Sequence, residues 1–252
     1  MRALLINYAF IIVLLFCLVA TGNAQSKMNS IEAGINLGTF IYQGDLTPER
    51  FGSSKTPGYQ FSFFLNKILS NSFSLRANLS VGKLRGDESL YAHPAYRQQR
   101  NFSFKSPVTE FSGLLVWDIL KKNFDPSKHS GWRPYIMAGP GLSFVDIKRD
   151  WSRFNSEYFA GTDLPARLVL DEQHALPKML PVIPVGIGFR YSLSEKLSFC
   201  AETLYRFTFS DYIDGFSQAA NPSRNDHYQS YSVGLICSFG RKNPLSCPII
   251  KK

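Results

Sequence analysis

The sequence is poor in the residues that build disulfide-stapled, metal-binding or helical membrane proteins. It has 4 cysteines and 4 histidines in 252 residues. After residue 24, no apolar run is long enough to cross a bilayer as a helix. The cysteines that follow, Cys200, Cys237 and Cys247, are odd in number and not closely paired, which makes a poor disulfide framework. The histidines have no metal-like spacing, so we expect no metal ion and no cofactor.

The first residues have the pattern of a secretory signal peptide. A short basic start, Met1-Arg2, precedes a nearly continuous apolar stretch over residues 3–20, and the small residues Gly22 and Ala24 come just before Gln25. We expect residues 1–24 to be cleaved and the mature chain to be exported. An uncleaved membrane anchor is the alternative.

The formal net charge is +9, and loss of Arg2 with the leader would reduce it to +8. A basic surface favours anionic partners. For an exported protein these would be lipopolysaccharide phosphates or acidic protein surfaces. No basic stripe with interleaved aromatic residues stands out, so we expect no nucleic-acid partner.

The mature chain alternates apolar and polar residues, most clearly over residues 197–210. One row of this stretch runs from Leu197 to Phe209 and is largely apolar, whereas the other carries Glu202 and Arg206. Side chains of a β-strand alternate between its two faces, so the pattern predicts a strand between two environments. A soluble sandwich would bury the apolar row. A strand of an outer-membrane barrel turns that row towards lipid and its charges inward.

Seven further segments alternate in the same way, which gives strands near residues 31–42, 59–66, 73–82, 109–119, 132–145, 182–191, 197–210 and 231–239. Such lengths suit tilted membrane-crossing strands. The connections alternate between long and short, as expected for external loops and periplasmic turns. The longest, residues 146–180, is predicted to be irregular. A soluble lipocalin-type barrel is the alternative, but it would have polar outward rows.

These features predict an all-β fold: an eight-stranded antiparallel up-and-down transmembrane β-barrel of the outer-membrane type. It would occupy residues 25–240 and be followed by a periplasmic tail, residues 241–252. We therefore expect the protein in the cell outer membrane, with outer-membrane lipid and lipopolysaccharide as its surroundings.

The inward rows collect seven ionisable residues, which we expect to form a structural ionic network: Glu32, Arg76, Glu110, Asp118, Arg190, Glu202 and Arg206. Charges in a narrow lumen must be paired and hydrogen-bonded. Side chains just fill an eight-stranded barrel, so a wide pore is not expected. Glu110 and Glu202 could form an acid–base couple, but the arginines already account for them. We name no catalytic residue and expect neither enzyme activity nor a small-molecule substrate.

Two other groups of loop residues allow weaker chemical interpretations. His227 near Ser223 is the nearest approach to the His and Ser of lipid-modifying barrels, but no third group orients the base. Asp211, Asp214 and Asp226 could bind Ca²⁺, although solvated loop carboxylates are the simpler interpretation.

Three segments together resemble one family: GINLGTFIYQGDL (Gly34 to Leu46), RPYIMAGPGL (Arg133 to Leu142) and ETLYRFTFSDYIDG (Glu202 to Gly215). They are similar to the small outer-membrane barrels of Bacteroidota that include PorG, the barrel component of the type IX secretion system. The resemblance runs from about Ile31 to Lys252. It implies a non-catalytic accessory role, in which the barrel helps to hold the periplasmic ring of the secretion machinery to the outer membrane.

That role would place the partner contacts on the periplasmic side. The candidates are Lys121, Lys122, Lys128, His129 and Trp132 in one link, and Arg241 and Lys242 in the tail. Solvated turn charges with an interfacial tryptophan are the alternative. An adhesion barrel, a general structural barrel and a related barrel without a secretion role also stay open.

Overall fold

A computed structural model describes residues 31–70, 72–120, 131–194 and 196–239. The expected signal peptide, the expected tail with Arg241 and Lys242, and the link residues Lys121, Lys122, Lys128 and His129 lie outside these ranges. The strands are β1 (Ile31–Gln43), β2 (Gly58–Ile68), β3 (Phe73–Asp87), β4 (Ser103–Asp118), β5 (Trp132–Ala138), β6 (Gly141–Val145), β7 (Lys148–Asp150), β8 (Met179–Ser192), β9 (Leu197–Thr208) and β10 (His227–Phe239). The helices are η1 (Glu88–Leu90), α2 (Tyr96–Arg100) and α3 (Leu164–Gln173).

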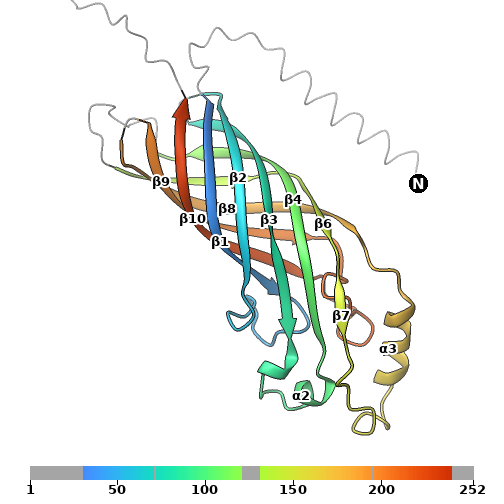
Figure 1. Ribbon diagram of the computed structural model, residues 1–252. Helices are drawn as coiled ribbons and strands as arrows, with labels where there is room; N and C mark the ends of the chain where they lie inside the picture. Colours follow the sequence, from blue (N-terminus) through green and yellow to red (C-terminus); the bar gives the residue numbers. More distant parts are fainter. Residues whose placement is uncertain (1–30, 71, 121–130, 195, 240–252) are drawn as a thin grey trace, which may run out of the picture.

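The strands form one closed antiparallel sheet, because β3 pairs with β4 and β1 pairs with β10 (Figure 1). Together β5 and β6 occupy one place in the ring, so the ring has eight strands. The ring closes with a stagger of ten residues. A path that starts at Ile31 of β1 and passes from each residue to its partner on the next strand returns to β1 at Ile41. The residues on this path are Lys67, Leu75, Leu115, Ala138, Val185, Tyr205 and Gln229. A stagger of this size requires strands tilted by about 40°. The predicted eight-stranded barrel is confirmed.

The break between β5 and β6 does not shift the pairing. Both strands keep one register with β4 and one with β8. The interruption falls at Gly139 and Pro140, where proline has no N–H to donate to the ladder. Hydrogen bonds from Gly113 N to the Pro140 carbonyl oxygen (3.0 Å) and from Gly139 N to the Pro184 carbonyl oxygen (3.2 Å) hold this point.

The external ends of the strands differ from the prediction. β3 continues to Asp87 and β4 begins at Ser103, so these strands extend further than expected as a long hairpin (Figure 1). The stretch expected to be irregular, residues 146–180, contains β7 and α3. In addition, His227 begins β10 and does not lie in a loop. At the external ends of β3 and β4 the alternation was hard to recognise, because outward positions beyond the lipid carry polar residues and both faces are then polar in part.

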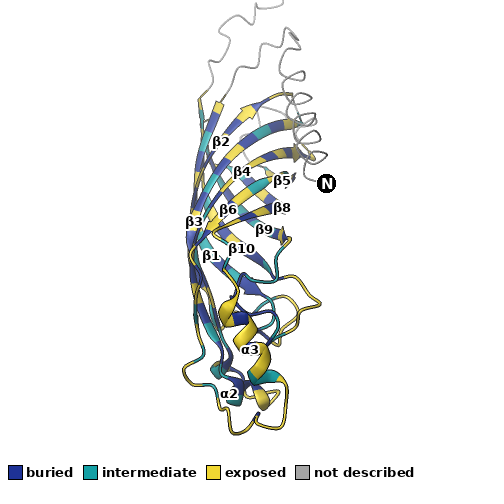
Figure 2. Ribbon diagram, turned by 90° about the vertical axis from the view of Figure 1, so that its right-hand side faces the viewer, coloured by how far each residue is buried: buried dark blue, intermediate teal, exposed yellow. Residues whose placement is uncertain are grey.

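Buried and exposed residues alternate along the strands (Figure 2). The exposed rows, which face outward, are largely apolar. Leu37, Phe111 and Ile187 are 62, 53 and 50% exposed. A soluble barrel would not leave such a girdle in water, so the outward faces are built for lipid. At the periplasmic end of this girdle, the rings of Trp132 and Tyr191 lie 5.1 Å apart. In the described part of the chain, no helix has the length and apolar character to cross a membrane.

Candidate functional site

The lumen holds three layers of buried ion pairs. In the layer nearest the periplasm, Glu32 of β1 binds Arg190 of β8 through two hydrogen bonds of 3.0 and 2.9 Å. Asn66 Nδ2 also donates to this carboxylate at 3.1 Å, and Ser238 Oγ lies 3.2 Å from it. A bidentate arginine–carboxylate pair with these further donors satisfies a charge that burial would otherwise make costly.

The second layer is centred on Glu202 of β9. Its Oε1 accepts hydrogen bonds from Arg76 Nη1 at 2.6 Å and from the Tyr135 hydroxyl at 2.5 Å. Its Oε2 accepts one from Asn36 Nδ2 at 2.8 Å. The Arg76 guanidinium carbon lies 3.9 Å from the centre of the Phe64 ring. Glu202 is therefore fully engaged as a structural anion.

The third layer, nearest the external mouth, is centred on Glu110 of β4. Its Oε2 accepts hydrogen bonds of 2.9 Å from both Arg206 Nε and the Tyr228 hydroxyl. Arg206 also donates to Ser230 Oγ at 2.6 Å and to the Leu204 carbonyl oxygen at 3.0 Å. Glu110 and Glu202 belong to different layers and each has its own arginine, so the geometry favours ion pairs over an acid–base couple.

Asp118 is also buried, at the periplasmic end of β4, so the structure places all seven predicted residues in the lumen. An eighth residue, which was not predicted, is Arg133 of β5; it is buried and donates to Ser192 Oγ at 3.1 Å. Arg133 is two residues from the inward-facing Tyr135 on the same strand, so the alternation could have indicated it. In the described strands, the lumen thus balances four carboxylates with four arginines.

Little space is left between these layers. The void bounded by Gln60, Ser62, Asn78, Arg76 and Arg206 measures about 10 Å³. A space of this size holds about one water molecule. The lumen in its described form is therefore a packed core and not a channel.

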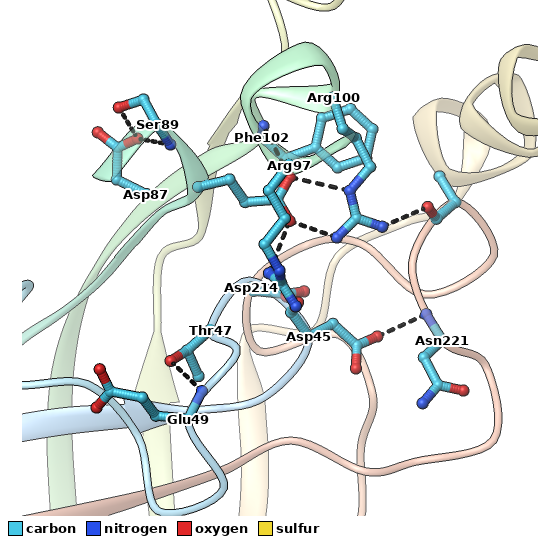
Figure 3. A network of polar contacts seen from close by, with 12 residues as sticks. Asp45, Thr47, Glu49, Asp87, Ser89, Arg97, Arg100, Phe102, Asp214 and Asn221 are labelled. Atoms are coloured by element: carbon cyan, nitrogen blue, oxygen red, sulfur yellow. Dashed lines mark hydrogen bonds and ion pairs between the residues drawn. The ribbon is translucent and has the colours of Figure 1, made fainter. Parts of the chain in front are cut away.

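A folded cap closes the external mouth. Its apolar core joins strand ends to loop residues, with the rings of Phe102 and Phe216 stacked 4.3 Å apart. Beside it lies the fully buried Glu88, which accepts hydrogen bonds from Arg97 Nη1 (2.9 Å), from Arg100 Nε (2.9 Å) and from Arg100 Nη2 (2.5 Å) (Figure 3). In the same cap Asp171 of α3 accepts backbone N–H groups from Ser217, Gln218 and Ala219. The external loops are thus joined by buried charges.

The prediction that the loop carboxylates are solvated is wrong for two of them. Asp214 and Asp226 are completely buried, and the Tyr42 hydroxyl lies 2.7 Å from Asp214 Oδ2 and 2.8 Å from Asp226 Oδ1. Burial raises the pKa of both carboxyl groups well above the usual value. Since a hydroxyl has only one proton to donate, Tyr42 can satisfy only one of the two carboxyl groups at a time.

Two neighbouring carboxyl groups are only partly buried. Burial raises the pKa of Asp45 to about 6 and that of Asp211 to about 7, from 3.8. Among the described residues, no group of three or more His, Cys, Asp or Glu side chains is arranged to hold a metal ion. No hydrogen bond within the described residues joins His227 to Ser223; His227 Nδ1 instead lies 3.4 Å from the backbone N of Thr208.

Residues 9–240 match the model of a protein family described as "Domain of unknown function (DUF6089)". The chain belongs to this family. No curated protein matches it.

Several solved structures are similar to this DUF6089 protein. Ail, the attachment invasion locus protein of Yersinia pestis, is 8% identical with a TM-score of 0.44, over 84% of this chain and 99% of Ail. Neisserial surface protein A is 14% identical with a TM-score of 0.44, over 83 and 97% of the two chains. OprG from Pseudomonas aeruginosa is 10% identical with a TM-score of 0.47, over 85 and 98%. Likenesses this distant do not indicate what the DUF6089 barrel binds.

Proposed function

We propose that this DUF6089 barrel is a non-catalytic outer-membrane protein that acts through its two ends, as an accessory or assembly component of the type IX secretion system. The observation that supports this most is the filled lumen. Four carboxylates and four arginines pack across it, and the void between two of its layers measures about 10 Å³, so the described strands leave little room for a solute. Its partners must then meet its surfaces.

The specific link to secretion comes from the sequence. The segments Gly34 to Leu46, Arg133 to Leu142 and Glu202 to Gly215 resemble the barrel family that includes PorG. In this proposal the barrel ties the outer membrane to periplasmic ring proteins. Of the candidate contacts, Trp132 lies in the described part of the chain, where it is 61% exposed at the periplasmic rim.

Deleting the gene and measuring type IX cargo at the cell surface tests this proposal. We expect cargo to be lost from the surface and to return when the full chain is restored. The barrel purified from membranes in mild detergent should bring periplasmic ring proteins with it. Normal cargo display in the deletion strain, together with a barrel free of ring proteins, would refute the secretion role.

A second candidate function is surface binding, and the folded external cap favours it. On the cap, α3 exposes two adjacent apolar side chains, Val169 (48%) and Leu170 (56%). Replacing both with serine should leave the cap folded, because the buried residues of this helix are Leu168 and Asp171. Loss of cell adhesion to host matrix, with cargo display intact, would support this second function.

A further inference from the structure

Four cations gather on the outer surface of the barrel, just beyond the apolar girdle. They are Lys83 and Arg85 on β3, Lys105 on β4 and Lys148 on β7, which we call the basic row. Arg85 is paired directly with Lys105, and Lys105 with Lys148. The three strands lie side by side beyond the girdle (Figure 1). Three like charges therefore stand in register across three strands.

The membrane-side members of the basic row, Lys83 and Arg85, lie nearest the depth of lipid headgroups. The outward residues of β3 from Phe73 to Val81 are apolar or small and span eight residue steps. This corresponds to about 27 Å along the strand and, at a tilt of about 40°, about 21 Å across the membrane. By the same geometry Lys83 and Arg85 lie about 5 and 10 Å beyond Val81. Lys105 and Lys148 are in register with Arg85 on the next strands of the tilted sheet and lie further out. The headgroup region is about 5–8 Å thick on each side of a bilayer, and long basic side chains can reach back into it.

The positive charge of the row is poorly neutralised by the protein. Among the described residues, no carboxylate oxygen lies within 4 Å of a side-chain nitrogen of Lys83, Arg85 or Lys105, and Lys148 Nζ is 3.9 Å from Asp146 Oδ2. Asp87 and Asp150 lie one outward position further from the membrane. Like charges directly opposite one another destabilise a sheet, so their register suits an anion from outside the chain.

The external ends of β8 and β9 differ from this sector of the barrel. They present uncharged outward side chains, namely Met179 and Phe207. A lipid interacting with the basic row would therefore occupy one side of the barrel and would not surround it uniformly.

A groove of about 370 Å³ opens beside the row, lined by Tyr59, Lys83, Phe104, Lys105, Pro107 and Lys148, with Ser103, Arg149 and Asp150. Tyr59 is 65% exposed at its membrane side. The groove therefore has an aromatic side chain on the side of the acyl chains and cations on the side of the headgroups. This arrangement suits an amphiphile that carries an anionic headgroup.

We propose that the basic row binds the phosphate groups of lipid A in the outer leaflet. Arginine and lysine both donate charge-assisted hydrogen bonds to phosphate oxygens, and three cations in register can share one phosphate or bridge two. The site requires only that the barrel spans the outer membrane. It is independent of a secretion role, and a barrel without one would still bind the lipid.

The test compares lipid retention by three proteins in nonionic detergent, measured by native mass spectrometry and by titration with lipid A. The proteins are the wild type, a triple variant (Arg85→Gln, Lys105→Gln, Lys148→Gln) and a matched control (Arg50→Gln, Lys67→Gln, Lys196→Gln). The control also removes one arginine and two lysines, all exposed and away from the row. Each protein is tested with phosphorylated lipid A and with the same lipid after removal of its phosphates.

We expect the triple variant to bind phosphorylated lipid A on the order of 100-fold more weakly, at roughly fivefold per cation near an anionic lipid surface. The control should bind like the wild type, and all three should bind the dephosphorylated lipid weakly. Wild-type binding should also fall as salt is added. Unchanged binding by the triple variant would overturn the proposal. The basic row would then be a site for a different anion, such as an acidic protein. Equal weakening in the control, or undiminished wild-type binding of the dephosphorylated lipid, would also overturn it.

Discussion

Neutralising Glu110 tests whether ion pairs hold the lumen together or merely occupy it. Glu110 and Arg206 are 0 and 1% exposed, and Glu110 Oε2 accepts hydrogen bonds from Arg206 and Tyr228. Glu110→Gln keeps the shape but leaves Arg206 as a buried charge without its counterion. Removing one partner of a buried pair costs about 3–5 kcal/mol. We therefore expect the free energy of unfolding to fall by about that amount.

The paired variant makes this test quantitative. Arg206→Met should cost a similar amount because it leaves Glu110 unpaired, but the double variant should lose much less than the sum. The expected coupling energy is about 2–3 kcal/mol. Urea unfolding of the barrel in lipid vesicles, followed by tryptophan fluorescence, measures all three variants, with the exposed Glu157→Gln as control. A Glu110→Gln loss below about 0.5 kcal/mol, or strictly additive losses, would refute the reasoning, since both lie outside the range for a buried pair.

Three further predictions concern the cap and the sheet. Burial raises the pKa of Asp45 and Asp211 from 3.8 to about 6 and about 7, so the folded cap binds protons that the unfolded chain has released. The stability of the cap should therefore fall as the pH rises from 4 to 7. Hydrogen exchange, corrected for intrinsic rates, should become faster over this range, and Asp211→Asn should reduce the pH dependence. Slower exchange in the cap at higher pH would contradict the prediction. Arg100→Met removes two of the hydrogen bonds to buried Glu88, so protease cleavage within the cap should increase while the heat-dependent electrophoretic shift of the barrel persists. Gly234→Ala should cost about 1–3 kcal/mol, because a Cβ there would overlap neighbouring backbone, whereas Gly113→Ala, with open space around its Cβ, should unfold like the wild type.

The strands and the face that each turns inward could be predicted because the alternation of apolar and polar residues is a local pattern. Alternation with a period of two needs only neighbouring residues, and it placed Glu32, Arg76 and Glu110 on the inward face, where they are buried. The same signal failed at the ends of β3 and β4. Beyond the lipid the outward positions become polar, as at Lys83 and Lys105, and only the cross-strand register shows that these residues still belong to strands.

The lumen shows the limit of local reasoning most clearly. The alternation identified Glu202 and Arg206 as inward, and they look like a pair on one strand. Residues four apart on a strand are separated by about 13 Å, too far for an ion pair. Glu202 instead binds Arg76, and Arg206 binds Glu110.

The sequence by itself determined which face of each strand meets lipid and which residues enter the lumen, because both follow from alternation along the chain. The tertiary structure alone decided which charges meet, because the ten-residue stagger of the closed ring sets which strands bring their side chains to one level. It also decided that Asp214 and Asp226 are buried, because loops distant in the sequence pack over them to form the cap. Burial of a loop carboxylate depends on which distant segments pack over it, and the local sequence pattern does not indicate those segments.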